Sequence, residues 1–200
     1  MILSYLESMA QVGLAMAFGY TFGLGDLLSG RLTTVKHRWF PGADLALGVA
    51  AGALAIAMLW LSLGGVHAFW LVAIGTWALA GRLFTVGKLL MAGVLAGYFA
   101  WWGVTADNLD APALAYFALA FPILTAAFAI AARAKTPTRW RALLGGKPSW
   151  PAFIVVFGYL AFFELDFSLL GVVWAFHSGT ATVADEKHRA KLVSWGVRTR

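Results

Sequence analysis

Long apolar runs separated by short polar segments dominate the pattern of this chain. The runs cover residues 2–28, 43–63, 67–106, 111–132 and 151–176. A helix needs about 20 apolar residues to cross a bilayer core of ~30 Å, and every run reaches about that length. The runs are apolar on every face and do not alternate with period two, which predicts helices and argues against the strands of a membrane barrel.

The run over residues 67–106 is long enough for two helices. Arg82 and Lys88 interrupt it, each preceded by a glycine, and these residues predict a turn. We therefore expect an all-α fold, a polytopic (multi-pass) transmembrane helix bundle with about six spans. Residues 1–176 form the bundle in this interpretation. Residues 177–200 form a basic tail with the amphipathic character of an interfacial segment.

Composition supports a membrane protein. Hydrophobic residues make up 61% of the chain and charged residues 12%, whereas soluble domains carry about 45–50% and about 25%. A globule of 200 residues could not bury so much apolar surface, so lipid is the expected solvent. The sequence has no cysteine, which excludes disulfides, thiolate metal sites and cysteine nucleophiles.

Basic residues gather in three of the segments between apolar runs, which predicts the orientation. They are Arg31, Lys36 and Arg38, then Arg82 and Lys88, then Arg133, Lys135, Arg139, Arg141 and Lys147. With six spans all three loops share one side, and the positive-inside bias places that side in the cytoplasm and the N-terminus outside. We expect the cytoplasmic membrane of a bacterium or archaeon. This placement of the net charge of +6 favours the lipid bilayer as partner over nucleic acid.

The basic tail disagrees with six spans, because an even number of crossings places it on the outside. One resolution is a tail that is an exception to the bias. The other is a segment 151–176 that does not cross but re-enters, with Glu164 and Asp166 at the tip of a hairpin. The pattern favours a true sixth span and leaves the hairpin open.

Three pairs of glycines spaced four apart predict close helix contacts, since small residues let backbones approach. The pairs are Gly19 with Gly23, Gly48 with Gly52, and Gly93 with Gly97. Packing inside one chain is the favoured interpretation, and a homo-oligomer or association with other membrane subunits is the alternative.

Charged residues within apolar runs are the first candidates for chemistry, because each costs several kcal/mol in hydrocarbon unless paired or hydrated (about 2.5–3.5 on insertion scales). Glu164 and Asp166, with Arg82 and Lys88, form a candidate polar path for transport. The alternative is a structural ion pair between these carboxylates and Arg82 or Lys88.

A second candidate site is the charged rim after the first apolar run. Its members are Asp26, Arg31, Lys36, His37 and Arg38. Basic residues at a helix end suit an anion or a lipid phosphate. The alternative is an ordinary solvated cytoplasmic loop.

No cofactor or metal is predicted. His67 and His177 lie near span ends and could in principle hold a haem, but neither has the mid-helix position that such a ligand pair requires. The Gly-x-Ser-x-Gly, P-loop and dinucleotide-binding motifs are absent.

The sequence thus favours a small membrane transporter or channel for a small solute or ion over an enzyme. Two alternatives stay open: a non-catalytic subunit of a larger membrane complex, such as an energy-transducing one, and an enzyme acting on a lipid head group.

Overall fold

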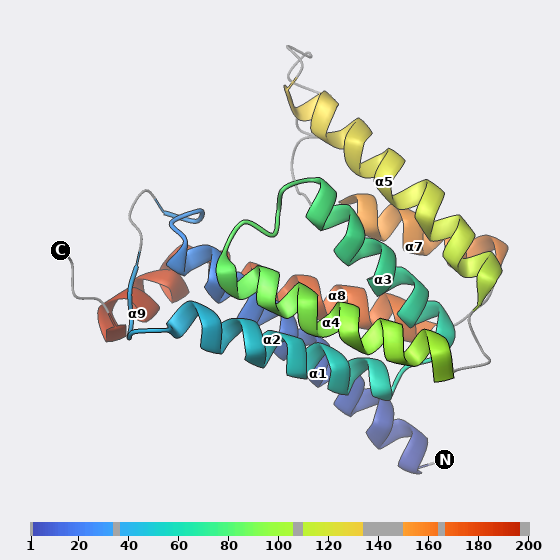
Figure 1. Ribbon diagram of the computed structural model, residues 1–200, viewed down its shortest axis with the longest axis horizontal. Helices are drawn as coiled ribbons and strands as arrows, with labels where there is room; N and C mark the ends of the chain where they lie inside the picture. Colours follow the sequence, from blue (N-terminus) through green and yellow to red (C-terminus); the bar gives the residue numbers. More distant parts are fainter. Residues whose placement is uncertain (1, 34–36, 106–109, 134–149, 164–166, 197–200) are drawn as a thin grey trace.

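The computed structural model describes residues 2–33, 37–105, 110–133, 150–163 and 167–196. These residues form helices and no strands, which confirms the all-α prediction. The helices, labelled as in Figure 1, are α1 (Ile2–Leu28), α2 (Ala43–Trp60), α3 (Gly64–Leu79), α4 (Val86–Thr105), α5 (Ala111–Arg133), α7 (Trp150–Phe162), α8 (Phe167–Ala184) and α9 (Glu186–Gly196).

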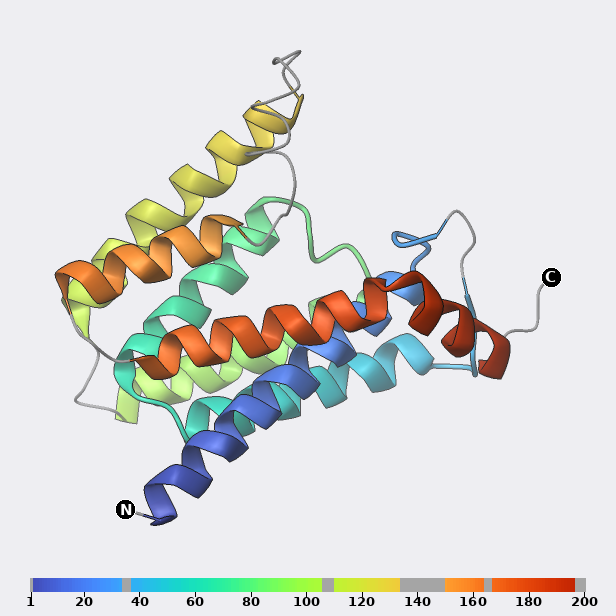
Figure 2. The same ribbon diagram turned by 180° about the vertical axis from the view of Figure 1, so that it is seen from behind.

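The helices form two groups. In the α1 group, α1 packs between α2 and α8, and α4 packs on the other side of α2. In the α3 group, α5 packs between α3 and α7. The groups approach each other where α7 joins α8 and where α3 begins, and they diverge toward the opposite end of the molecule (Figures 1 and 2).

Two of the three glycine pairs explain why the α1 group is tight. A side chain at Gly19 would collide with the backbone of Phe176 in α8, and one at Gly48 would collide with the backbone of Gly87 in α4. The pair Gly93 and Gly97 on α4 has no atom within contact distance. Close packing inside the chain is therefore confirmed for the pairs of α1 and α2, while the pair of α4 faces outward.

The segment 151–176, predicted as one span, is not a single helix. It falls into α7 and α8, which are separated at residues 163–166 and run antiparallel (Figure 2). Residues 164–166, with the predicted carboxylates Glu164 and Asp166, lie outside the described part of the chain. The division agrees with the hairpin alternative rather than with the favoured single span.

This division changes which helix ends lie together. The end of α1 and the start of α2, the end of α3 and the start of α4, the end of α5 and the start of α7, and the end of α8 lie toward one end of the molecule, here named the basic end (Figure 2). In sequence, the segments that join these helix ends and the tail hold the basic clusters. The start of α1 lies at the opposite end, together with the end of α2 and the start of α3, the end of α4 and the start of α5, and the end of α7 and the start of α8. The conflict between the basic tail and the other basic loops is thereby removed.

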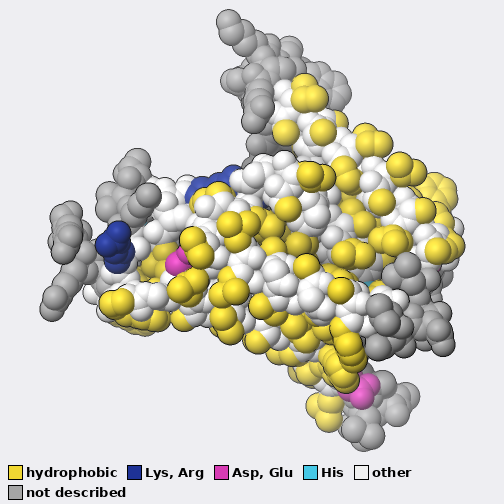
Figure 3. Space-filling view, viewed as in Figure 1, with side chains coloured by type: hydrophobic (Ala, Val, Ile, Leu, Met, Phe, Trp, Pro, Cys, Tyr) yellow, Lys and Arg dark blue, Asp and Glu magenta, His cyan; other side chains and the backbone are white. Residues whose placement is uncertain are grey.

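Apolar side chains cover much of the face of the molecule in Figure 3, and many large apolar side chains of the described residues are exposed. Two helical stretches, Ala43–Trp60 and Ala111–Ile130, are long and apolar enough to cross a membrane by themselves, and Gly64–Leu79, Trp150–Phe162 and Ser168–Ala184 are apolar but shorter. Only 17% of the stretch in α5 is buried inside the protein. An apolar helix with so little protein around it requires another apolar partner or solvent.

The tail forms a helix of its own. α8 continues past residue 177 to Ala184, so the tail begins later than predicted, and α9 follows. Leu192 and Val193 of α9 pack against the small core of Leu24, Leu27 and Val183. Lys187, Lys191 and Trp195 are exposed. α9 therefore has one face packed on this small core and one face exposed.

Candidate functional site

A cavity of about 370 Å³ lies at the basic end, between the two groups of helices; we call it the central cavity. Its walls come from α1, α3, α4, α5, α7 and α8 and from the segments after α1 and α3. The polar lining residues are Asp26, Arg31, Arg82, Lys88, His177 and Thr180. The apolar lining residues are Phe22, Leu32, Phe69, Trp70, Trp77, Phe121, Ala152, Val173 and Phe176. The cavity is thus charged in one part and aromatic in another.

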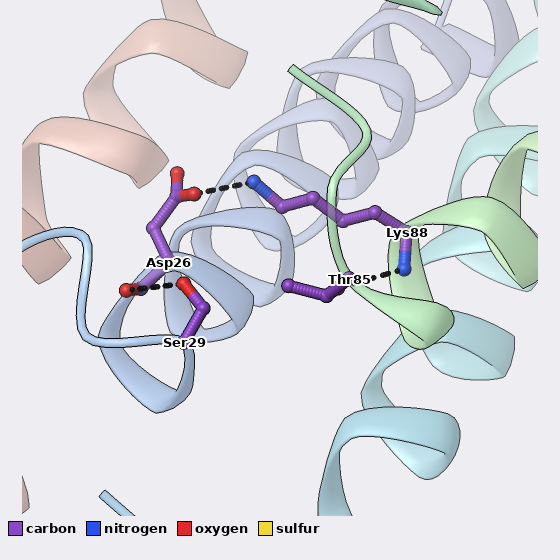
Figure 4. Close-up of polar contacts among 4 residues, drawn as sticks. All are labelled: Asp26, Ser29, Thr85 and Lys88. Atoms are coloured by element: carbon purple, nitrogen blue, oxygen red, sulfur yellow. Dashed lines mark hydrogen bonds and ion pairs between the residues drawn. The ribbon is translucent and has the colours of Figure 1, made fainter. Parts of the chain in front are cut away.

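An ion pair between α1 and α4 forms one side of the charged part (Figure 4). Lys88 Nζ donates a hydrogen bond to Asp26 Oδ1 over 2.5 Å, with side chains only 5% and 20% exposed. The ammonium also lies 3.8 Å from the centre of the Phe22 ring, a cation–π contact. A buried lysine needs such a partner, because an unpaired buried charge destabilises the fold by several kcal/mol.

The start of α4 holds Lys88 in this position. The backbone N–H of Lys88 donates to Thr85 Oγ1 (3.1 Å), which caps the helix (Figure 4). The N–H of Gly87 donates to Asp44 Oδ2 of α2 (2.8 Å). Because two of the free N–H groups of the first turn are satisfied by these side chains, α4 begins in a fixed place and directs Lys88 toward α1.

Arg82 reaches the cavity from the end of α3. Gly81 has φ +64°, the left-handed conformation that ends many helices, and the N–H of Arg82 donates to the carbonyl of Trp77 (2.8 Å). Within the described residues, the Arg82 guanidinium makes no hydrogen bond or ion pair. Burial and then the charge of Arg31 lower the pKa of Arg82, while Asp26 opposes this shift. An arginine nevertheless stays charged in proteins.

Arg31 adds a second guanidinium. It is exposed, and its Cζ lies 4.7 Å from the centre of the Phe84 ring. Since Asp26 balances Lys88, the charges of Arg31 and Arg82 are not balanced by any carboxylate lining the cavity. The charged part of the cavity therefore carries an excess of positive charge and favours an anion.

Aromatic rings form the deeper wall. The rings of Trp77 and Phe176 stack with centroids 5.6 Å apart, Trp70 contacts Phe176 at 4.9 Å, and Phe22 contacts Trp77 at 5.3 Å. Trp70 lies seven residues before Trp77 on α3, or about 10 Å along the helix axis. The wall thus extends roughly two turns away from Arg82, and it suits the apolar part of a ligand.

A second cavity of about 330 Å³ lies beside the start of α2, lined by His37, Arg38, Asp44, Ser29 and Thr85 among others. His37 is buried, and its Nε2 is hydrogen-bonded to Thr33 Oγ1 (3.0 Å). The structure therefore divides the predicted rim: Asp26 and Arg31 line the central cavity, and His37 and Arg38 line this second one. Lys36 lies outside the described residues.

Of the residues in the predicted polar path, the structure describes Arg82 and Lys88, and both line the central cavity. The expected alternative partner of Lys88 was Glu164 or Asp166, but Lys88 pairs with Asp26. The apolar and polar pattern does not predict that one residue from each candidate site forms this pair. The one signal in the sequence is the position of each residue relative to its helix end. Asp26 is two residues before the end of α1, and Lys88 is two residues after the start of α4, so both lie at a similar distance from the same end of the bundle.

The two histidines considered for haem have different surroundings. Nδ1–H of His67 donates to the carbonyl of Leu63 (3.1 Å), and Nε2 accepts from the hydroxyl of Tyr98 (3.0 Å). Both ring nitrogens of His67 are occupied, so this arrangement leaves none for iron. His177 lines the central cavity instead.

Among the described residues, no group of three or more His, Cys, Asp or Glu side chains could hold a metal ion. The chain matches no protein-family model, no curated protein and no solved structure.

Proposed function

We propose that this protein is an integral membrane protein in which α1 to α5 lie across the bilayer, α7 and α8 enter it as a helical hairpin, and the basic end is in the cytoplasm. Three features support this: the apolar exterior, two helices of spanning length and composition, and the position of the basic clusters. An odd number of crossings leaves the N-terminus outside and α9 inside, where its lysines and tryptophan suit the interface.

We further propose that it is a carrier for a small organic anion with an apolar body. The central cavity supports this proposal most directly. Two of its arginines have no carboxylate in the lining to balance their charge, and a wall of aromatic rings lies beside them. A ligand that satisfies both parts combines a negatively charged group with an apolar one.

The arrangement of the helix groups favours transport over simple binding. The central cavity is at the end where the groups diverge. At the other end, the ring of His67 in α3 stacks on Trp102 in α4 with centroids 4.5 Å apart, so the two groups are packed together there. A site reached from one side and closed by packing at the other suits a carrier, in which one bundle rocks against another.

An enzyme acting on a lipid head group is the second candidate. The observation that favours it is that Asp26 and His177, an acid and an imidazole, line the same cavity as the cations. Such groups serve as general acid and base. A carrier releases its ligand unchanged, whereas an enzyme leaves a new product that mass spectrometry detects.

The proposed carrier is tested with purified protein in liposomes loaded with 1-naphthalenesulfonate, a fluorescent anion with an apolar ring. We expect release that depends on the protein, is lost in Arg82→Gln, and is retained in Arg38→Gln, an arginine that lines the second cavity. A naphthyl trimethylammonium salt is the cationic control and should stay inside. Release of both probes at equal rates, or of neither, would overturn the proposal.

A further inference from the structure

The number and type of the cations define the charged group of the ligand. Asp26 neutralises Lys88, which leaves Arg31 and Arg82 facing the cavity with two positive charges. A carboxylate or sulfate ester carries one negative charge, whereas a phosphate monoester carries about −1.5 to −2 at pH 7. The charge excess therefore matches a phosphate monoester best.

Hydrogen-bonding capacity agrees with charge. A guanidinium presents a planar set of donors that fits two oxygens of one phosphate, so two arginines can engage a phosphate more fully than a carboxylate. Lys88 adds to this capacity, because its ammonium has three donors and within the described residues only one is used, on Asp26. A phosphate supplies three oxygens for these donors.

The aromatic wall defines the remainder of the ligand. It begins at Trp77, next to the turn that carries Arg82, and reaches Trp70 about two turns deeper. A free inorganic phosphate would leave this apolar wall without a partner. A ligand with its phosphate among the arginines and an apolar chain along Trp77 and Trp70 fills both parts.

We infer that the central cavity binds a phosphate monoester carried on an apolar chain, that is, a lipid phosphate or a molecule that resembles one. This inference rests on the proposed anion site and specifies its ligand class. Arg82 and Arg31 hold the phosphate, Lys88 contributes its unused donors, and Trp77, Phe176 and Trp70 hold the start of the chain.

Calorimetric titration of the full-length protein in nanodiscs tests the inference, with octyl phosphate, octyl sulfate, octanoate and inorganic phosphate as ligands. At pH 7.5 we expect octyl phosphate to bind at least about tenfold more tightly than each of the other three. Inorganic phosphate tests whether a free phosphate is sufficient, and octyl sulfate and octanoate test whether any amphipathic anion is.

Acidity provides a second, independent readout. The second pKa of a phosphate monoester is about 6, so octyl phosphate gains charge and should bind more tightly as the pH rises from 5 to 7.5. The protein groups that line the site are Asp26, Arg31, Arg82, Lys88 and His177. Octyl sulfate keeps its charge and therefore reports the contribution of the protein alone.

Substitutions of arginines inside and outside the central cavity test whether octyl phosphate binds there. Arg82→Gln and Arg31→Gln should each weaken octyl phosphate binding by about 10- to 100-fold, because each removes charge-assisted hydrogen bonds. Arg38→Gln, which removes an arginine of the second cavity, should leave the affinity unchanged. Circular dichroism and size-exclusion chromatography establish that each variant is folded, and Arg82→Lys should restore part of the affinity.

The outcomes separate the inference from the proposed function. Equal affinity for octyl phosphate, octyl sulfate and octanoate, all reduced in Arg82→Gln, would overturn the phosphate assignment and leave the anion site standing. Equal affinity for inorganic and octyl phosphate would overturn the role of the chain. Binding of none of the four anions, or equal losses in Arg82→Gln and Arg38→Gln, would overturn both.

Discussion

The polar groups at the two ends of the helix bundle differ in how completely they are paired. At the end that holds the N-terminus, polar side chains pair with one another across helices: Gln11 Nε2 donates to Ser62 Oγ (2.7 Å), and the hydroxyl of Tyr159 donates to Asp110 Oδ2 (3.2 Å). His67 has both ring nitrogens bonded. At the basic end, one ion pair is complete and two guanidiniums around the same cavity are not matched by a carboxylate of its lining.

This difference indicates separate roles. Polar groups in an apolar environment are stable when their hydrogen bonds are complete, so the pairs at the first end hold helices together. An excess of one sign of charge beside a cavity contributes little to the fold, because like charges repel and lose solvation. We propose that an anionic ligand balances the excess at the basic end.

Breaking the Asp26–Lys88 ion pair should have the largest effect on the free energy of unfolding. Asp26→Asn leaves the ammonium of Lys88 buried without a counter-ion, and should lower the free energy of unfolding by about 3–5 kcal/mol. Lys88→Met in the same chain removes that charge and should recover most of the loss. Chemical unfolding in detergent measures both variants. Equal stability of wild type and Asp26→Asn would show that the pair does not hold the basic end together.

Disturbing the close packing between α1 and α8 should have the second-largest effect on stability. Gly19→Ala places a methyl group against the backbone of Phe176, so the two helices have to separate, at a cost of about 1–3 kcal/mol. Gly93→Ala is the matched control, since nothing lies within contact distance of that glycine. In thermal unfolding in detergent, Gly19→Ala should have a lower midpoint temperature than the wild type, and Gly93→Ala should not. A similar midpoint for both would mean that α1 and α8 are not in close contact.

The smallest effect is expected at the end that holds the N-terminus. Tyr159→Phe removes the hydroxyl that donates to Asp110, and should cost about 0.5–1.5 kcal/mol of stability. The affinity for octyl phosphate should not change, because Tyr159 does not line the central cavity. A loss of affinity with unchanged stability would show that the two ends do not have separate roles.

Much of the fold can be predicted from the apolar runs. The runs 2–28, 43–63 and 111–132 coincide closely with α1, α2 and α5, and the turn near Arg82 separates α3 from α4. The same pattern offers the break between α7 and α8 only as an alternative, through the carboxylates Glu164 and Asp166. An apolar run reports that its residues avoid water, but it does not report chain direction, and the segment 151–176 contains no loop rich in glycine or basic residues.

The individual charged residues of the candidate site can be predicted from the sequence. Their positions relative to one another in the fold cannot. Asp26, Arg31, Arg82 and Lys88 attract attention because charges next to apolar runs are costly. Their union in one cavity depends on which helices are neighbours, and the sequence pattern does not contain that information. The aromatic wall is still harder to predict, because aromatic residues make up 15% of the chain and Trp70 and Trp77 do not stand out among them.

Cysteine accessibility tests the two-ended arrangement most directly, because the chain has no cysteine of its own. Single variants Arg38→Cys, Leu63→Cys and Ser194→Cys are labelled in sealed vesicles with a membrane-impermeant maleimide. Arg38 and Ser194 are exposed at the basic end, and Leu63 is exposed between α2 and α3 at the other. We expect positions 38 and 194 to be labelled from the same side and position 63 from the opposite side. Labelling of position 194 together with position 63 would contradict the account, since α7 and α8 would then make a single crossing.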